Sequence, residues 1–247
     1  DLKEEDSMAI LRQARAGALL ALFGLWVVAG CAASSANYSS ILTNSDRPQN
    51  ERDLDAARKP DQVLAFYGVK SGDRVADISA GRGYYTAILS QVVGPQGLVY
   101  TVNASSRDEI NQRWKSAQFA NVRVADGPFD KLALPQDGSL DFVIIHLNYH
   151  DLAPETRGPM NKRILAALKR GGIYAVVDHS AKDGSGNEAN KTLHRIDKFE
   201  VIKEVTASGF KLAKEGEMLR KPGDTRDFNV NKVRNQDDRF VLAFEKP

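Results

Sequence analysis

The chain of 247 residues contains a single cysteine. One cysteine excludes an internal disulfide and any metal site that needs several thiolates. The sequence also lacks a large excess of either charge, with 34 Lys and Arg against 32 Asp and Glu, which argues against nucleic acid as the main partner. Because 42% of the residues are hydrophobic and 27% charged, the composition excludes a disordered chain and predicts one folded domain with an appendage.

The strongest apolar run, residues 16–30, is shorter than a membrane-spanning helix. It reads AGALLALFGLWVVAG, which is 15 residues without a charge, whereas a bilayer span needs about 20. Arg12 and Arg15 precede it. A basic start, a short apolar centre and small residues at the end are typical of a secretory signal peptide.

The end of this run carries a more specific pattern. Val28-Ala29-Gly30-Cys31 resembles the lipobox of bacterial lipoproteins, in which the cysteine is lipidated and becomes the first mature residue. We therefore expect a signal peptide at residues 1–30, a flexible tether rich in Ser, Asn and Ala at 31–50, and the folded domain at 51–247. By analogy with lipoprotein sorting, Ala32 after the cysteine implies a lipid anchor in the cell envelope, on the periplasmic face of the outer membrane.

From residue 51 the sequence alternates between strand and helix patterns, which predicts an α/β fold with a doubly wound, Rossmann-like sheet of seven strands. The helices are expected at residues 84–93, 107–119, 154–169 and 193–208. The strands are expected at residues 74–78, 97–102, 122–125, 140–145, 173–177, 210–214 and 239–245. No helix pattern separates the last two strands, so the sheet is expected to be mostly parallel with an antiparallel last strand. Ligands of such sheets bind at the carboxyl ends of the strands.

A glycine-containing loop follows the first predicted strand. Residues 75–86 read VADISAGRGYYT, so that the strand ends near Asp77 and a helix begins after Gly83. The dinucleotide fingerprint G-x-G-x-x-G fails here, because Thr86 occupies the third glycine position. The acidic residue expected about 20 positions further on is replaced by Asn103. The loop therefore disfavours an NAD site.

The order of these segments resembles the class I S-adenosylmethionine-dependent methyltransferases. The run of strand, Asp, small residues, Gly-x-Gly and helix is similar to motif I of that family. Further similarity follows in GLVYTVN (97–103), VRVADG (122–127), DGSLDFVIIHLNYHDL (137–152), LKRGGIYAVVDHS (168–180) and ASGF (207–210). The resemblance extends from about residue 70 to the C-terminus.

The resemblance implies roles for the first loop and for the strands that follow it. Asp77 would orient the loop and the methionine amino group of the cofactor, and the methionyl part would lie against the loop. Asn103 stands where the family usually has a carboxylate for the ribose hydroxyls, and a neutral amide is the weaker acceptor. The remaining cofactor-contacting candidates are Ser79, Gly81, Gly83, Asp126 on the adenine and His146 in the loop beside the methyl group.

The four histidines of the chain fall near the predicted strand ends. His146 and His150 flank the loop after the fourth strand, His179 ends the fifth, and His194 is expected to begin the next helix. We expect them to face one cleft, where an imidazole would remove a proton from the methyl acceptor. His150 and His179 are the first candidates for this base and His146 the third, although His146 and His150 also fit a structural lining.

Three of these histidines, together with Asp151 or Asp178, would also suit Zn²⁺ or another divalent ion. Their spacing matches no recognised metal motif, so no metal site is expected. The sequence therefore predicts methyl transfer from S-adenosylmethionine to a small-molecule acceptor. The alternative is a non-catalytic envelope lipoprotein that binds a small molecule or a metal ion, because S-adenosylmethionine is made in the cytoplasm and a fold does not determine an activity.

The lipid anchor is testable by replacing Cys31 with serine. Because acylation requires the thiol, we expect Cys31→Ser to leave the protein unlipidated and uncleaved, whereas the neighbouring Ser34→Ala should be processed normally. Mass spectrometry of the mature N-terminus measures both changes. A wild-type protein with an unmodified N-terminus at another residue would contradict the assignment.

Overall fold

The computed structural model describes residues 38–247. The predicted signal peptide and Cys31 lie outside the described residues. The folded domain begins before residue 51, where the tether was expected to end. Tyr38 is buried, and its hydroxyl donates to the carbonyl oxygens of Leu64 and Val69. These contacts attach residue 38 to the end of a helix in the domain. The folded domain therefore includes residues 38–50, which were expected to belong to the tether.

Seven strands form one sheet in the order β3-β2-β1-β4-β5-β7-β6. The strands are β1 Arg74–Ile78, β2 Leu98–Val102, β3 Val122–Val124, β4 Leu140–His146, β5 Leu168–His179, β6 Lys211–Gly216 and β7 Arg239–Glu245. From β3 to β5 the neighbours pair in parallel, and β7 lies antiparallel between β5 and β6. The predicted doubly wound sheet with an antiparallel last strand is confirmed.

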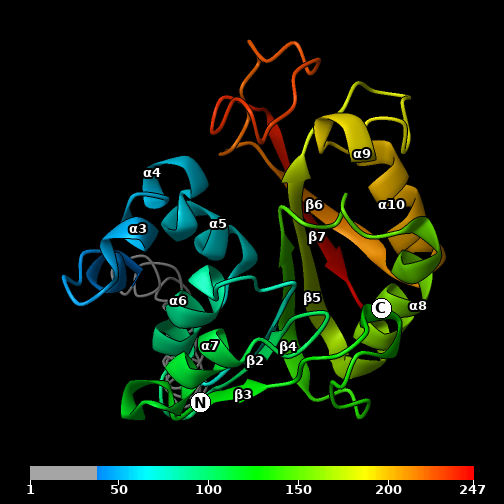
Figure 1. Cartoon of the computed structure of the whole chain (residues 1–247). Coiled ribbons are helices and arrows are strands. Elements are labelled where there is room, and N and C mark those ends of the chain that lie inside the picture. Colours follow the sequence, from blue (N-terminus) through cyan, green and yellow to red (C-terminus); the bar gives the residue numbers. More distant parts are fainter. Residues whose placement is uncertain (1–37) are drawn as a thin grey trace, which may run out of the picture. The chain divides into compact units, whose positions relative to one another are not determined.

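Helices cover both faces of the sheet (Figure 1). The helices are α3 Gln49–Arg52, α4 Asp55–Arg58, α5 Pro60–Tyr67, α6 Tyr84–Val93, α7 Asp108–Asn111, α8 Pro154–Ala167, α9 Asn190–Leu193 and α10 Lys198–Ala207, with short 3₁₀ turns at Gln112–Lys115, Ala117–Phe119 and Phe129–Lys131. None of the helices within residues 38–247 combines the length and the apolarity needed to cross a membrane.

The central strands are buried on both faces, as a parallel sheet between two helix layers requires. Along β4, Phe142 and Ile144 belong to the core cluster that includes α5 and α6. Val143 and Ile145 belong to the opposite cluster, with α8 and α10. The continuous apolar run of this strand thus supplies two separate cores.

The helix expected at residues 107–119 is broken in the structure. It consists of α7 and two 3₁₀ turns, separated at Ser116, which has an extended backbone. Trp114 and Phe119 are both buried and their rings meet edge to face, with centroids 5.0 Å apart. In one straight α-helix, residues five apart point about 140° away from each other. The break lets both aromatic side chains enter the same core.

The helix expected at residues 193–208 begins later, at Lys198. Asp197 is its N-cap, and its carboxylate accepts a hydrogen bond from the backbone N–H of Phe199. Ile196 pairs with Ser180 in an isolated β-bridge, so the chain before the cap is extended. His194 therefore does not begin a helix; it follows α9 in the left-handed conformation, with φ of 55°.

Trp114 also packs under the glycine loop that precedes α6. Gly83 has a φ of 83°, and a Cβ there would lie 2.2 Å from the Trp114 ring. Gly81 has a φ of 59°, but a Cβ there would meet nothing within 4 Å. The first glycine thus faces open space, whereas the second is required by packing.

This difference predicts unequal costs for two alanine substitutions. Each substitution should lower the free energy of unfolding by about 1–2 kcal/mol, because an L-residue is strained in the left-handed region. Gly83→Ala should lose about 1–3 kcal/mol more, because Trp114 must move. Urea unfolding of Gly83→Ala and of Gly81→Ala as its matched control measures the difference. Equal losses would show that Trp114 does not constrain the loop.

Candidate functional site

A cavity of about 470 Å³ opens at the carboxyl ends of β1, β4 and β5. Its other walls come from α3 and α4, the start of α6 and the segment between β6 and β7. The volume is in the range of small-molecule sites. Of the residues that the sequence implicated, Asp77, Ser79, Gly81, His146 and His179 line it, whereas Gly83, Asn103, Asp126 and His150 do not.

Asp77 brings a buried carboxyl group to the cavity wall. It lies near the end of β1, is 3% exposed, and accepts a hydrogen bond of 2.7 Å from the Thr86 hydroxyl. Burial raises the pKa of Asp77 to about 6, and the hydrogen bond from Thr86 only partly opposes this. The carboxyl group therefore changes charge close to neutral pH.

Arg58 is a cavity residue that the sequence analysis missed. Its guanidinium stacks over the Tyr84 ring at 4.5 Å, and burial lowers its pKa. No carboxylate within residues 38–247 forms an ion pair with it. An arginine remains charged in proteins, and a partly desolvated charge is costly without a partner. Arg58 thus suits an anionic ligand, but nothing in its helical sequence context marks it out.

Asn103 and Asp126 form a chain of hydrogen bonds beside the cavity. The Oδ1 atom of Asn103 accepts from the Gly81 N–H at 2.9 Å. The Asn103 N–H donates to Asp126 Oδ1 at 2.8 Å, and the Asn111 amide donates to Asp126 Oδ2 at 2.9 Å. The side chain at position 103 therefore ties the glycine loop to β2, in addition to any contact with a ligand.

His179 and Asp237 form a pair at the junction of β5 and β7. Nδ1 of His179 lies 2.5 Å from Asp237 Oδ2, and Arg239 Nε donates to the same oxygen at 2.6 Å. Burial would raise the pKa of Asp237, but His179 and Arg239 hold it well below its usual value. With Nδ1–H donated to a carboxylate, Nε2 of the neutral ring is a proton acceptor.

Asp237 is the second residue that the sequence analysis missed. A signal for it exists, because Asp237 precedes a strand that runs antiparallel to its neighbours. The amino end of such a strand lies at the carboxyl edge of the parallel strands, where ligands bind. The acidic pair Asp237-Asp238 before β7 could therefore have been placed at the site.

His146 lies in the cavity wall as a neutral ring. Its centroid is 4.6 Å from that of Tyr85, and its buried Nε2 has no hydrogen-bond partner among residues 38–247. Burial lowers the pKa of His146 well below its usual value, and the charges of Arg58 and Arg239 lower it further. The ring is a weak proton acceptor and suits a lining role.

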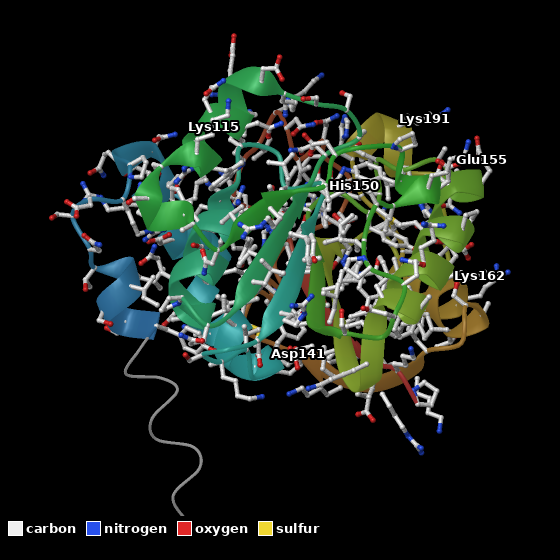
Figure 2. All side chains as sticks on the ribbon, turned by 90° about the horizontal axis from the view of Figure 1, so that it is seen from below. Lys115, Asp141, His150, Glu155, Lys162 and Lys191 are labelled. Atoms are coloured by element: carbon white, nitrogen blue, oxygen red, sulfur yellow. The ribbon has the colours of Figure 1, made fainter. Side chains whose placement is uncertain are left out.

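The other two histidines lie beside the cavity. His150 is buried among the strand ends, whereas the labelled Lys115, Lys162 and Lys191 are on the periphery (Figure 2). Its ring is 5.5 Å from that of His179 and 5.6 Å from that of His194, measured between centroids. Burial would lower the pKa of His150, but the carboxylates of Asp178 and Asp151 raise it to about 10. The four histidines are thus close together, but only His146 and His179 face the cavity.

Sequence comparisons match up to about half of the chain to methyltransferases. The family model of protein-L-isoaspartate(D-aspartate) O-methyltransferase matches residues 56–129. The chain is 30% identical over 110 residues to protein-L-isoaspartate O-methyltransferase of Ignicoccus hospitalis, covering 44% of this chain and 48% of that protein. It is 30% identical over 120 residues to demethylmenaquinone methyltransferase of Staphylococcus aureus, covering 48% of each. The chain thus spans about half the length of these curated relatives.

Solved structures match most of the domain. A SAM-dependent methyltransferase from Aquifex aeolicus superposes with a TM-score of 0.57 at 20% identity, covering 84% of this chain and 97% of that one. Geranyl diphosphate C-methyltransferase from Streptomyces coelicolor superposes with a TM-score of 0.61 at 12% identity, covering 84% of each. At these identities the likeness concerns the fold. Residues 38–247 therefore have the fold of the class I S-adenosylmethionine-dependent methyltransferases.

Proposed function

We propose that this protein transfers a methyl group from S-adenosylmethionine to a small-molecule acceptor. The observation that carries this proposal is the combination of groups in one cavity. The cavity wall contains an unpaired guanidinium, a buried carboxyl group and an open glycine backbone, which belong to Arg58, Asp77 and Gly81. It also contains a histidine held by a carboxylate, the pair His179 and Asp237.

The first set of groups fits the amino-acid end of the cofactor. Arg58 would bind its carboxylate and Asp77 its ammonium group, while the space above Gly81 lets a ligand approach the backbone. When bound, S-adenosylmethionine supplies an electrophilic methyl group on a sulfonium. The nucleoside end would extend toward Asn103 and Asp126, whose hydrogen bonds already fix the glycine loop.

The second set of groups fits the acceptor. Nε2 of His179 would take the proton from the acceptor's nucleophilic atom, and Asp237 would keep the ring in the required tautomer and stabilise the imidazolium. His146 and Tyr85 would form part of the cavity wall. His150 is less suited to act as the base, because both of its ring nitrogens lie against carboxylates.

Two further observations support a small-molecule acceptor, and a third supports an envelope location. The cavity is concave and of limited volume. The names of the Staphylococcus and Streptomyces proteins refer to demethylmenaquinone and geranyl diphosphate, which are small molecules. The lipobox-like run before Cys31 supports our proposal that a lipid anchor holds the domain in the cell envelope.

The cofactor site is testable through Arg58. Loss of a charge-assisted hydrogen bond costs about 1.5–3 kcal/mol, so Arg58→Met should weaken S-adenosylmethionine binding at least about tenfold. Arg170→Met, at the exposed opposite end of β5, is the matched control and should bind normally. Isothermal calorimetry measures both.

A second ligand distinguishes loss of the Arg58 contact from a general disruption of the binding site. 5′-Methylthioadenosine has the nucleoside and the sulfur but no amino-acid carboxylate, so its affinity should be the same in wild type and in Arg58→Met. If the wild type binds neither compound, the methyltransferase proposal fails and the non-catalytic binding protein is favoured.

The raised pKa of Asp77 predicts that Asp77→Asn has opposite effects on the stability of the fold and on cofactor binding. Its pKa in the folded protein, about 6, lies above the ordinary 3.8, so the buried charge destabilises the fold as pH rises through this interval. Asp77→Asn should therefore raise the free energy of unfolding at pH 7.5, by up to about 3 kcal/mol, and by nothing at pH 3.5. The same variant should bind S-adenosylmethionine more weakly at pH 7.5.

Thermal unfolding at the two pH values and calorimetry at pH 7.5 measure these effects. Thr86→Val, which removes the hydroxyl that donates to Asp77, is the matched control and should destabilise the fold at pH 7.5. An unchanged unfolding temperature in Asp77→Asn at pH 7.5 would show that no charge is buried at this position.

A further inference from the structure

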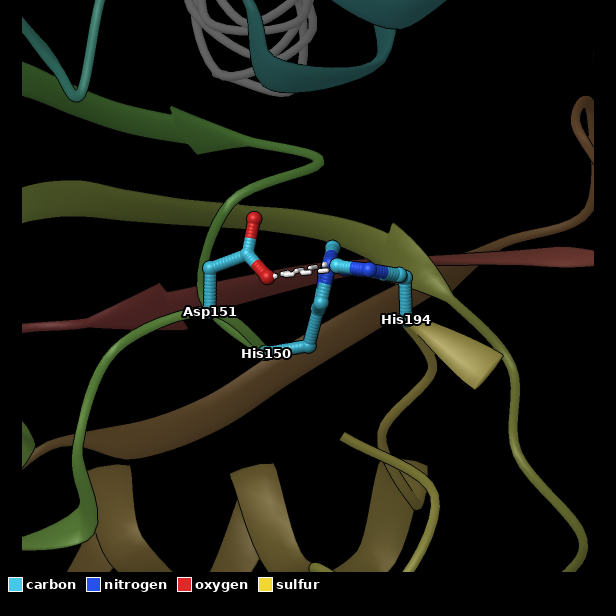
Figure 3. Close-up of side chains that lie close together, drawn as sticks. All are labelled: His150, Asp151 and His194. Atoms are coloured by element: carbon cyan, nitrogen blue, oxygen red, sulfur yellow. Dashed lines mark hydrogen bonds and ion pairs between the residues drawn. The ribbon is translucent and has the colours of Figure 1, made fainter. Parts of the chain in front are cut away.

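Two histidines and a carboxylate converge outside the cavity. Asp151 Oδ1 lies 3.2 Å from Nε2 of His150 and 3.0 Å from Nδ1 of His194. Figure 3 shows the three side chains pointing toward one another from two separate loops. The three donor atoms lie within 4.8 Å of one another.

The His150 ring is oriented by a carboxylate on its far side. Its Nδ1 lies 2.8 Å from Oδ1 of the fully buried Asp178, and the His150 backbone N–H donates to Oδ2 at 2.8 Å. With the Nδ1 proton given to Asp178, Nε2 points at the carboxylate of Asp151, and a metal ion would replace the second ring proton that otherwise lies between these two atoms. Two acceptors that face each other at 3.2 Å need a proton or a cation between them.

His194 is presented by an anchored loop. It has a left-handed backbone and directly precedes Arg195, which is fully buried. Arg195 donates to the carboxylate of Asp224 at 2.7 Å and to the carbonyl oxygen of Ser180 at 2.8 Å. These bonds hold the chain next to His194, so the backbone that carries its imidazole is fixed by the fold.

We propose that Nε2 of His150, Nδ1 of His194 and one oxygen of Asp151 bind a divalent transition-metal ion, for which Zn²⁺ is the best match. Zinc takes histidine and carboxylate ligands at about 2.0–2.2 Å in a tetrahedron, whose edges are then about 3.4 Å. The observed separations of 3.2 and 3.0 Å require only a small outward shift.

The chemistry of the donors selects the class of ion. Two imidazole nitrogens favour zinc-like ions over Mg²⁺ and Ca²⁺, which prefer oxygen ligands. Three protein ligands leave a coordination position for water or for an oxygen of another ligand. A carboxylate on the second nitrogen of a metal-binding histidine, as Asp178 is here, is a common support of such sites.

This site differs from the expectation that no metal would bind. Spacing rules search for ligands close together in the sequence, but His194 and Asp151 are 43 residues apart and meet only through the fold. The proposal does not depend on methyl transfer, because none of the three ligands lines the cavity.

The test is a zinc titration of the full chain carrying Cys31→Ser, so that no thiol competes for the metal. After treatment with a chelator, competition with a chromophoric zinc indicator should show one equivalent of tightly bound Zn²⁺. His194→Asn and Asp151→Asn should each weaken this binding more than about 100-fold. Removing a residue that only supports a metal ligand costs up to about 100-fold, and removing a ligand should cost more. Both side chains are partly exposed, so the fold should tolerate the changes.

Glu188→Gln is the matched control, because it removes an exposed carboxylate from the same segment as His194 and should leave zinc affinity unchanged. Substitution by Co²⁺ should give the visible absorption of a four- or five-coordinate ion, which His194→Asn should abolish. Millimolar Mg²⁺ should not compete. The proposal is overturned if the parent protein binds no zinc, or if the zinc that it binds is unaffected by both ligand variants.

Discussion

The parallel arrangement of the central strands is the constraint on which the rest of the structure depends. Parallel neighbours end at the same edge of the sheet, and between two helix layers their interiors are buried on both faces. In β1, β4 and β5 the charged and histidine side chains are therefore near the strand ends, and those at the carboxyl ends are Asp77, His146, Asp178 and His179. The groups that we assign to the site are at this edge, in loops that reach it, or, for Arg58 and Tyr85, in helices α4 and α6 beside it.

Most buried charges at this edge are tolerated because they have a partner of opposite charge, whereas Asp77 and Arg58 form no ion pair within residues 38–247. Burial would raise the pKa of Asp178, but His150 and His179 lower it below its usual value. Arg195 and Asp224 are both fully buried and form an ion pair of 2.7 Å. Arg58 has no such carboxylate among residues 38–247, and our proposal that it binds an anionic group of the ligand depends on this observation.

Asp178 links the two candidate sites. Its carboxylate accepts from the His150 ring and from the backbone N–H groups of His150 and His179. It thereby joins the end of β5 to the loop after β4. The proposed base and the proposed metal ligand are thus held by one buried group, although only the base faces the cavity.

The sequence by itself determined the helix and strand layers and a mostly parallel sheet with an antiparallel last strand. Apolar runs such as residues 140–145 and the glycine loop at 79–83 depend on local periodicity and backbone freedom, so they can be recognised without the fold. It also indicated the edge at which the site lies, and five of the residues in the cavity wall.

Only the tertiary structure decided which groups become partners. The pairs His179–Asp237 and His194–Asp151 join residues 58 and 43 positions apart, and no local pattern encodes such contacts. The broken segment at 107–119 has the same cause, because burial of both Trp114 and Phe119 outweighs the helical preference of the chain.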